Sequence, residues 1–250
     1  MLRSLLFAAA LGLACSMVGN AQTVDELVAN YVKTIGGMDK LQSIKSMRQT
    51  GTFHGGGGFE ASVVEEQQRP GMIREAFSIQ GMSQIVAYDG KQGWKIDPFQ
   101  GKKDAETLGE EELKSIVEDS DFDGPLVNYK EKGNRIEYLG KEDLEGSDVY
   151  KLKVTLADGT VKTFYLDTDY YVPIKIETKQ TIRGTEIETE AILGDYKQVG
   201  GVYFPHSFEN GVKGSPNKTS VTIDKIEINP SLSDSLFAMP HTGPGPKVSH

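Results

Sequence analysis

From residue 47 onward the chain is a succession of short segments in which apolar and polar residues alternate, and this pattern constrains the fold more than any other feature. A period of two is typical of β-strands, because successive side chains point to opposite faces of a sheet. The segments cover residues 62–68, 73–79, 83–88, 94–96, 150–156, 161–166, 174–181, 186–196, 202–209 and 219–228, with a further one from about residue 135. Their connections are short and rich in Gly, Pro and Asp-Gly, so consecutive segments are expected to pair as antiparallel hairpins.

Helical patterns are found in residues 23–36, 39–45 and 109–119. Thr23 followed by Glu26 predicts a capping box at the first helix, and Asp39 is the predicted N-cap of the second. A sheet of about ten strands twists and curls, which leaves a concave apolar face. We therefore predict a mainly β (α+β) fold: a single curved antiparallel sheet, or half-barrel, whose concave face is covered by short helices. A sandwich of two sheets is the alternative.

The amino terminus predicts export. Arg3 supplies a positive charge, residues 5–14 form an apolar run, and Gly19-Asn20-Ala21 matches the small-x-small pattern of a cleavage site. The apolar run is shorter than the roughly 20 residues that a membrane-spanning helix needs. We therefore expect residues 1–21 to be a signal peptide that is removed in the periplasm. A retained membrane anchor is the alternative, and a lipid-modified Cys15 is another.

The rest of the chain is expected to form one domain over residues 22–240, followed by a flexible tail over residues 241–250, because no repeat or linker divides it. Cys15 is the only cysteine, so cleavage after Ala21 excludes disulfides and thiol chemistry. The net charge of −9 argues against nucleic acid and against electrostatic binding to anionic membranes.

The sequence offers little support for catalysis. The four histidines have no metal-binding spacing, and no G-x-S-x-G motif is present. The acidic clusters at Glu65-Glu66, residues 110–112 and residues 119–123 are expected to be solvated charges, although paired carboxylates are also the groups of glycoside hydrolases. Asp119, Asp121 and Asp123 alternate as in a calcium loop, but the twelve-residue pattern fails. We expect no enzyme activity, no cofactor and no metal.

An apolar ligand site is a better match. Methionine and aromatic side chains on the early strands are expected to line the concave face, although a fully packed core is the usual fate of such residues. The candidates are Met72, Phe77, Ile79, Met82, Ile85, Trp94, Ile96 and Phe99.

The order of several short motifs resembles the LolA-like periplasmic carriers of outer-membrane lipoproteins. These motifs are Arg69-Pro70, then Asp89-Gly90-Lys91, then Trp94, and then Pro98-Phe99. Residues 158–164 and the acidic turn near residues 167–169 resemble the last paired strands of that family, and residues 232–240 resemble its closing segment. Residues 195–206 have no clear equivalent in the shorter carriers and are predicted to form an added hairpin.

The resemblance implies a half-barrel and a non-enzymatic role. It also implies that Arg69 lines the cavity and bonds backbone carbonyls of the covering helices, a task that suits the several donors of a guanidinium. A solvated arginine at a strand end is the alternative. The predicted function is a periplasmic carrier of lipoprotein acyl chains or another apolar ligand, with a membrane receptor or donor complex as a possible partner. The alternatives are an interaction module of the cell envelope with a packed interior and an exported hydrolase.

Overall fold

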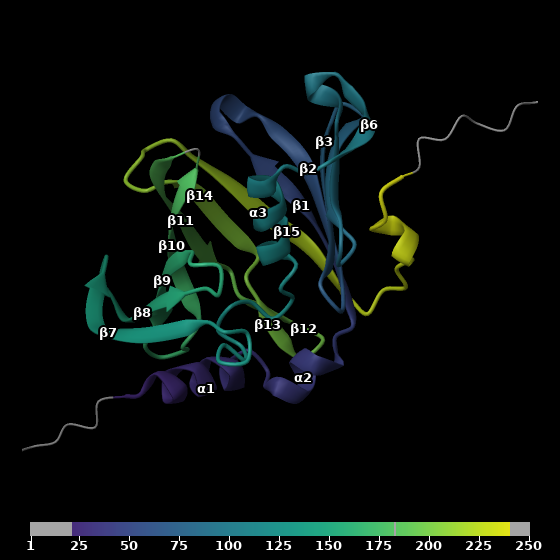
Figure 1. Ribbon diagram of the computed structural model, residues 1–250. Coiled ribbons are helices and arrows are strands. Elements are labelled where there is room, and N and C mark those ends of the chain that lie inside the picture. Colours follow the sequence, from purple (N-terminus) through teal and green to yellow (C-terminus); the bar gives the residue numbers. More distant parts are fainter. Residues whose placement is uncertain (1–21, 183, 241–250) are drawn as a thin grey trace, which may run out of the picture.

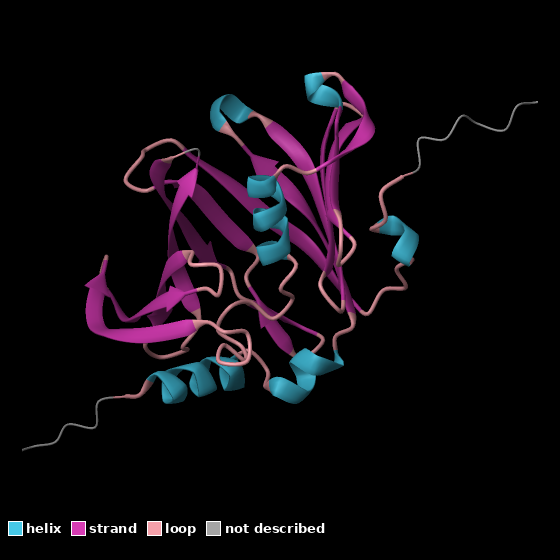
Figure 2. Cartoon of the chain, in the orientation of Figure 1, coloured by secondary structure: helices cyan, strands magenta, loops and turns pink. Residues whose placement is uncertain are grey.

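The computed structural model describes residues 22–182 and 184–240. The predicted signal peptide over residues 1–21 and the predicted tail over residues 241–250 lie outside the described residues. Strands dominate the rest, with few helices (Figure 2).

The three predicted helices are present as α1 (Val24–Thr34), α2 (Met38–Ser43) and α3 (Glu110–Asp119). The predicted capping box is confirmed: the Glu26 backbone N–H donates to Thr23 Oγ1 over 3.2 Å, and the Thr23 backbone N–H donates to Glu26 over 2.8 Å. The N-cap of α2 is Gly37 and not Asp39, which lies inside the helix. Gly37 has φ 87°, a value that a glycine adopts without the steric cost of a Cβ atom.

Thirteen strands form one antiparallel sheet, in the order β6-β5-β4-β3-β2-β1-β15-β14-β11-β10-β9-β8-β7. Their bounds are β1 (Ser46–His54), β2 (Glu60–Gln68), β3 (Met72–Ile79), β4 (Met82–Tyr88), β5 (Gly93–Asp97), β6 (Lys102–Thr107), β7 (Arg135–Leu144), β8 (Ser147–Thr155), β9 (Val161–Asp167), β10 (Pro173–Ile182), β11 (Thr185–Gly194), β14 (Ser207–Val212) and β15 (Lys218–Ile228). The sheet is not closed, because β6 and β7 are edges. The predicted single curved sheet is therefore confirmed, with thirteen strands instead of about ten.

The edge strand β6 accounts for one of the strands that the prediction missed. The sequence of β6, Lys-Lys-Asp-Ala-Glu-Thr, has no apolar alternation, because an edge strand pairs on one side only and most of this one is exposed. The predicted hairpin in residues 195–206 is confirmed as β12 (Lys197–Val199) paired with β13 (Val202–Phe204), outside the large sheet.

The pairing of β1 with β15 joins the two ends of the fold, from Met47 opposite Ile228 to His54 opposite Ser220. A register shift occurs at Gly51, where a Cβ atom would lie 2.2 Å from the carbonyl oxygen of Thr222. The backbones thus approach too closely there for any residue with a side chain. The result is one continuous sheet that curves around α3 (Figure 1).

The core divides between the two halves of the sheet. On β8 and β9, the concave face is filled by Leu27 of α1 and Leu126 of the segment after α3, both fully buried against Leu152 and Phe164. On β3 and β4, Ile116 of α3 packs against Ile73, with other side chains of α3 and β4 around them. In the middle of the sheet, Met47 of β1 and Ile223 of β15 form a third buried cluster, against which Phe122 packs.

The C-terminal segment lies on the opposite, convex face, beside β3–β5 (Figure 1). Phe237 is fully buried there, next to the short helix η3 (Asp234–Leu236), and its carbonyl accepts a 2.7 Å hydrogen bond from the indole N–H of Trp94. Gln68 at the end of β2 donates to Asp234 over 2.7 Å. These contacts attach the end of the chain to the outside of the sheet.

Replacing Phe237 with Ala should lower the free energy of unfolding by about 3–5 kcal/mol, since a fully buried aromatic ring is lost. Urea unfolding measures the change, and the emission of Trp94 should move to longer wavelength as its surroundings become wet. Leu139→Ala is the control, because Leu139 is an apolar residue that is 51% exposed, and it should change the free energy by less than about 0.5 kcal/mol. Equal costs for the two variants would mean that the C-terminal segment contributes no stability.

Candidate functional site

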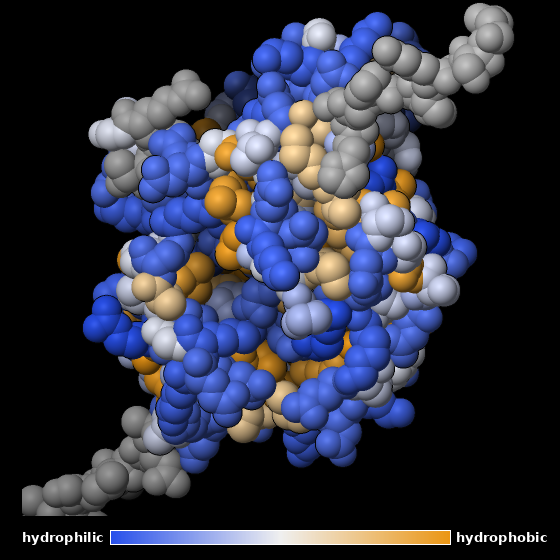
Figure 3. Space-filling view, turned by 45° about the vertical axis from the view of Figure 1, so that its right-hand side comes forward, coloured by the Kyte–Doolittle hydropathy of each residue, from blue (hydrophilic) through white to orange (hydrophobic). Residues whose placement is uncertain are grey.

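Two adjacent hollows lie on the concave face. One has a volume of about 360 Å³ and lies over β1–β4, β14 and β15; we call it the carboxylate hollow. The other, about 910 Å³, extends under α3 toward α1 and α2, and we call it the helix-side hollow. Gln49, Glu65 and Phe208 line both of them, so the two hollows are adjacent. In the space-filling view, apolar surface shows in recesses on both sides of a polar ridge (Figure 3).

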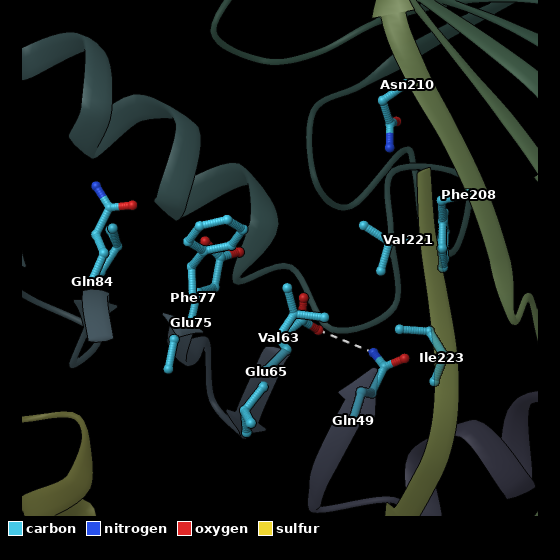
Figure 4. Close-up of a pocket in the computed structure, with 13 residues that line it drawn as sticks. Gln49, Val63, Glu65, Glu75, Phe77, Gln84, Phe208, Asn210, Val221 and Ile223 are labelled. Carbon is cyan, nitrogen blue, oxygen red and sulfur yellow. Dashed lines mark hydrogen bonds between the residues drawn. The ribbon is translucent and has the colours of Figure 1, made fainter. Parts of the chain in front are cut away.

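The walls of the carboxylate hollow are mainly apolar. Phe77 and Val63 come from the strands near the start of the sheet, and Phe208, Val221 and Ile223 come from the strands near its end (Figure 4). These side chains share a face because of the strand register: Val63 is opposite Phe77 on the neighbouring strand, and Phe208 is opposite Val221. A hollow of this size and lining is typical of sites for small apolar ligands.

A row of polar side chains crosses this apolar surface. Gln49, Glu65 and Glu75 occupy directly opposite positions on β1, β2 and β3. The Gln49 side-chain amide donates to Glu65 over 3.0 Å (Figure 4). Within the described part of the chain, no hydrogen bond or ion pair reaches the Glu75 carboxylate. Two carboxylates thus stand side by side on the wall of an apolar recess.

Both carboxyl groups are hard to ionise. Removal from water raises the pKa of Glu65 to about 7, and the negative charge of Asp119 adds to the effect. Removal from water also raises the pKa of Glu75 to about 8, with the charge of Glu65 as the next cause. The two carboxyl groups therefore change their protonation state near neutral pH.

One end of the carboxylate hollow carries a group of phenylalanines. The Phe77 ring packs edge-on against Phe53, with 5.3 Å between the ring centres, and against Phe99 at 6.4 Å. Phe59 also packs against Phe53 and Phe77. Phe59 and Phe99 are each 40% exposed, so apolar surface continues from the hollow to the outside.

The helix α3 crosses the opening and is bound to both halves of the sheet. On the side of β2 and β5, the Lys95 ammonium pairs with Glu112 over 2.5 Å, and the Gln67 amide donates to the Asp119 carbonyl over 2.9 Å. On the other side, Lys162 of β9 pairs with Glu118. Ion pairs of this kind, which are partly exposed, contribute little stability each, so the buried packing of Ile116 against Ile73 is the main apolar anchor of the helix.

Arg69 connects the end of β2 to the covering elements. Its guanidinium donates to the carbonyls of Ile44, over 2.8 Å, and Leu41, over 3.2 Å, at the end of α2. It also forms a two-pronged ion pair with Asp123, over 2.7 and 2.5 Å, and stacks over the Phe122 ring. Arg69 therefore holds together α2, β2 and the segment that follows α3.

The predicted ligand-cavity residues fall on both faces of the sheet. Phe77 lines the carboxylate hollow, and Phe99 packs against the Phe77 ring. Ile79 and Met82 are opposite each other where β3 ends and β4 begins. The prediction is wrong for the other four, Met72, Ile85, Trp94 and Ile96, because their side chains point to the convex face. Because Gln84 and Val86 line the hollow, their neighbour Ile85 points to the convex face, and its strand partner Ile96 points with it.

Trp94 and Met72 belong to the convex face as well. Trp94 is opposite Ala87, next to Val86 of the hollow, and its N–H bonds Phe237 on the outside of the sheet. Met72 is next to Ile73, which faces α3, so it points away from the hollow. Assigning the face of each strand from apolar character alone therefore failed, since the convex face is also apolar where the C-terminal segment covers it.

The sequence-based prediction of the cavity residues does not include the acidic residues Glu65 and Glu75. Glu65 was expected to be solvated and instead lies in the hollow. Glu66 was expected to be solvated too, but it is 4% exposed on the convex face, between Arg48 at 2.8 Å and Arg74 at 2.9 Å. The exposed positions of residues 110–112 agree with the expectation. The alternation Val63-Glu65 and Glu75-Phe77 on neighbouring strands is the sequence signal that places these carboxylates among apolar residues.

Across residues 22–182 and 184–240, no three His, Cys, Asp or Glu side chains converge as a metal-binding group. His206 is buried, with its Nδ1 3.0 Å from the Phe204 carbonyl, and His54 lies beside Glu60 at 3.3 Å. None of the helices in the described residues combines the length and the apolar character needed to cross a membrane.

Comparison with known proteins shows the fold. No protein-family model matches the sequence, and no curated protein matches it. Among solved structures, a LolA superfamily protein from Nitrosomonas europaea is similar at 13% identity, with a TM-score of 0.59; the match covers 87% of this chain and 98% of that one. The chain therefore has a fold similar to that of this structure.

Two further structures are more distant. A putative outer membrane lipoprotein-sorting protein domain from Vibrio parahaemolyticus has a TM-score of 0.49 at 13% identity and covers 86% of this chain and 97% of its own. A DUF1329 family protein from Desulfovibrio piger has a TM-score of 0.49 at 12% identity and covers 87% and 98%.

The raised pKa of Glu75 makes stability depend on pH. Its carboxyl has a pKa of about 8 in the folded chain and 4.5 as the reference value, so its stabilising contribution is complete below pH 4.5 and is lost as the pH rises through 8. Glu75→Gln removes this loss. At pH about 9 the variant should be more stable than the parent by at least about 1.4 kcal/mol, the value of one pKa unit.

Urea unfolding of both proteins between pH about 5 and 9 measures this difference. Glu186→Gln is the matched control, because the Glu186 side chain is 58% exposed, and its pH profile should follow that of the parent. A Glu75→Gln profile parallel to that of the parent would show that Glu75 is ionised normally.

Proposed function

We propose that this protein is a periplasmic, non-enzymatic carrier of lipid-anchored or other apolar cargo. The observation that carries the proposal is the pair of adjacent hollows, about 360 and 910 Å³, on the concave face of an open sheet. Sites for small apolar ligands typically have volumes of about 300–1,000 Å³. A cell-envelope interaction module with a packed interior has no use for such space.

The covering elements support the same proposal. A carrier has to admit its cargo and then exclude water, which calls for a cover that detaches without unfolding the sheet. α3 is held by two ion pairs and by the packing of the Ile116 side chain against Ile73, while the strands beneath it keep their own hydrogen bonds. The LolA-like fold and the export signal expected in residues 1–21 support a periplasmic location.

Native mass spectrometry of the protein purified from the periplasm tests the proposal, because bound lipid adds a discrete mass. A variant that fills the carboxylate hollow sharpens the test: Val63→Phe adds a ring beside Phe77. It should weaken binding of a lipid probe at least about tenfold, which corresponds to about 1.4 kcal/mol.

Leu139→Phe is the matched control, since it adds a similar volume at an exposed position on the edge strand β7. Its affinity for the lipid probe should equal that of the parent. If the purified protein carries no lipid, and Val63→Phe binds the probe as the parent does, the carrier proposal is wrong.

Arg69 is proposed to hold the cover in place. Arg69→Leu removes the donors to Ile44 and Leu41 and leaves the Asp123 carboxylate without its partner, which should cost about 1–3 kcal/mol of stability. Because α2 and the segment after α3 lose their common anchor, the rates of lipid uptake and release should change by a larger factor than the stability does.

Stopped-flow exchange of a fluorescent lipid measures both rates. Arg69→Lys is the control for charge: it keeps the positive charge but not the planar set of donors, so it should lie between the parent and Arg69→Leu. Rates and melting temperature of Arg69→Leu equal to those of the parent would make Arg69 a solvated strand-end charge.

A further inference from the structure

The carboxylate hollow contains two acidic groups and no cation of its own. Glu65 and Glu75 are adjacent on β2 and β3, among the side chains of Val63 and Phe77. Gln49 donates one hydrogen bond to Glu65, and Glu75 has no partner among the described residues. The remaining polar groups of the wall are the neutral amides of Gln84 and Asn210.

The charged groups around the hollow do not compensate the pair. Asp119 of α3 adds a third negative charge, which disfavours ionisation of both glutamates. The cations on the surrounding elements already have acidic partners: Lys95 of β5 pairs with Glu112, Lys162 of β9 with Glu118, and Arg69 with Asp123. The recess therefore has a negative potential when its carboxylates are ionised.

Placing two carboxylates in an apolar recess without a counter-charge is unfavourable for the empty protein. A ligand that brings a cation removes this penalty and gains a charge-assisted hydrogen bond as well. A ligand with an anionic head meets the opposite situation, because its charge has to approach two like charges.

On these grounds we propose that the carboxylate hollow binds a cationic amphiphile, with its ammonium head between Glu65 and Glu75 and its apolar chain along Phe77, Phe208 and Ile223. The two glutamates and these apolar side chains line the same hollow. Its apolar surface continues to the exposed rings of Phe59 and Phe99. This inference rests on the proposed carrier function and specifies the class of cargo.

Three probes with the same twelve-carbon chain test the inference: dodecylammonium, dodecanol and dodecanoate. Each is titrated below its micelle concentration into the mature protein, with displacement of a neutral fluorescent apolar probe as the readout. At pH about 9 the carboxylates are ionised and the alkylammonium is still largely charged. Dodecylammonium should then bind at least about tenfold more tightly than dodecanol, and dodecanoate more weakly than dodecanol.

Lowering the pH to about 5.5 protonates the pair, and the preference for dodecylammonium over dodecanol should fall below about threefold. Glu65→Gln and Glu75→Gln should each reduce the preference at pH about 9, because dodecylammonium affinity falls by a larger factor than dodecanol affinity changes. Glu186→Gln, at an exposed site, should keep the full preference. The pH series on the parent protein tests the inference even if a variant does not fold.

The outcomes separate this inference from the carrier function. If dodecanol binds and dodecylammonium shows no preference over it at pH about 9, the inference is wrong and the carrier function stands. If none of the three probes binds, both are wrong. A preference that persists at low pH, or in both glutamine variants, also overturns the inference, because the ammonium would then be held elsewhere.

Discussion

The pairing of β1 with β15 is the interaction on which the remaining structure depends. It places a strand that begins at residue 46 beside one that ends at residue 228, and so makes a single sheet of thirteen strands from two runs of hairpins. The concave face is continuous only because of this junction. Val63 and Phe77 line the carboxylate hollow on one side of it and Ile223 on the other, and the close backbone contact at Gly51 shows how tightly the two ends are joined.

Much of the fold follows from the sequence because it depends on local patterns. The alternation of apolar residues identifies most strands, and the Thr23-Glu26 pair identifies the start of α1. The edge strand β6 escapes detection because a strand that is paired on one side and mostly exposed needs no apolar alternation. Its charged side chains match those of a loop.

The site is harder to predict, since it requires knowledge of which face each strand turns inward. A shift of one residue moves every side chain to the other face, so Ile85 and Ile96 were assigned to the wrong side while Phe77 was not. Apolar character does not settle the question, because the C-terminal segment makes part of the convex face apolar as well. The position of Arg69 depends on α2 and Asp123, which are distant in the sequence.

The attachment of Phe237 to Trp94 also affects how the protein can be studied. Trp94 is the sole indole of the chain, and the sheet separates it from the hollows. Its intrinsic emission thus reports whether the C-terminal segment is docked, and it does not respond to a ligand in the hollows. An unchanged tryptophan emission during a titration does not show whether a ligand fills the hollows. Ligand binding therefore has to be followed with an extrinsic label or by mass.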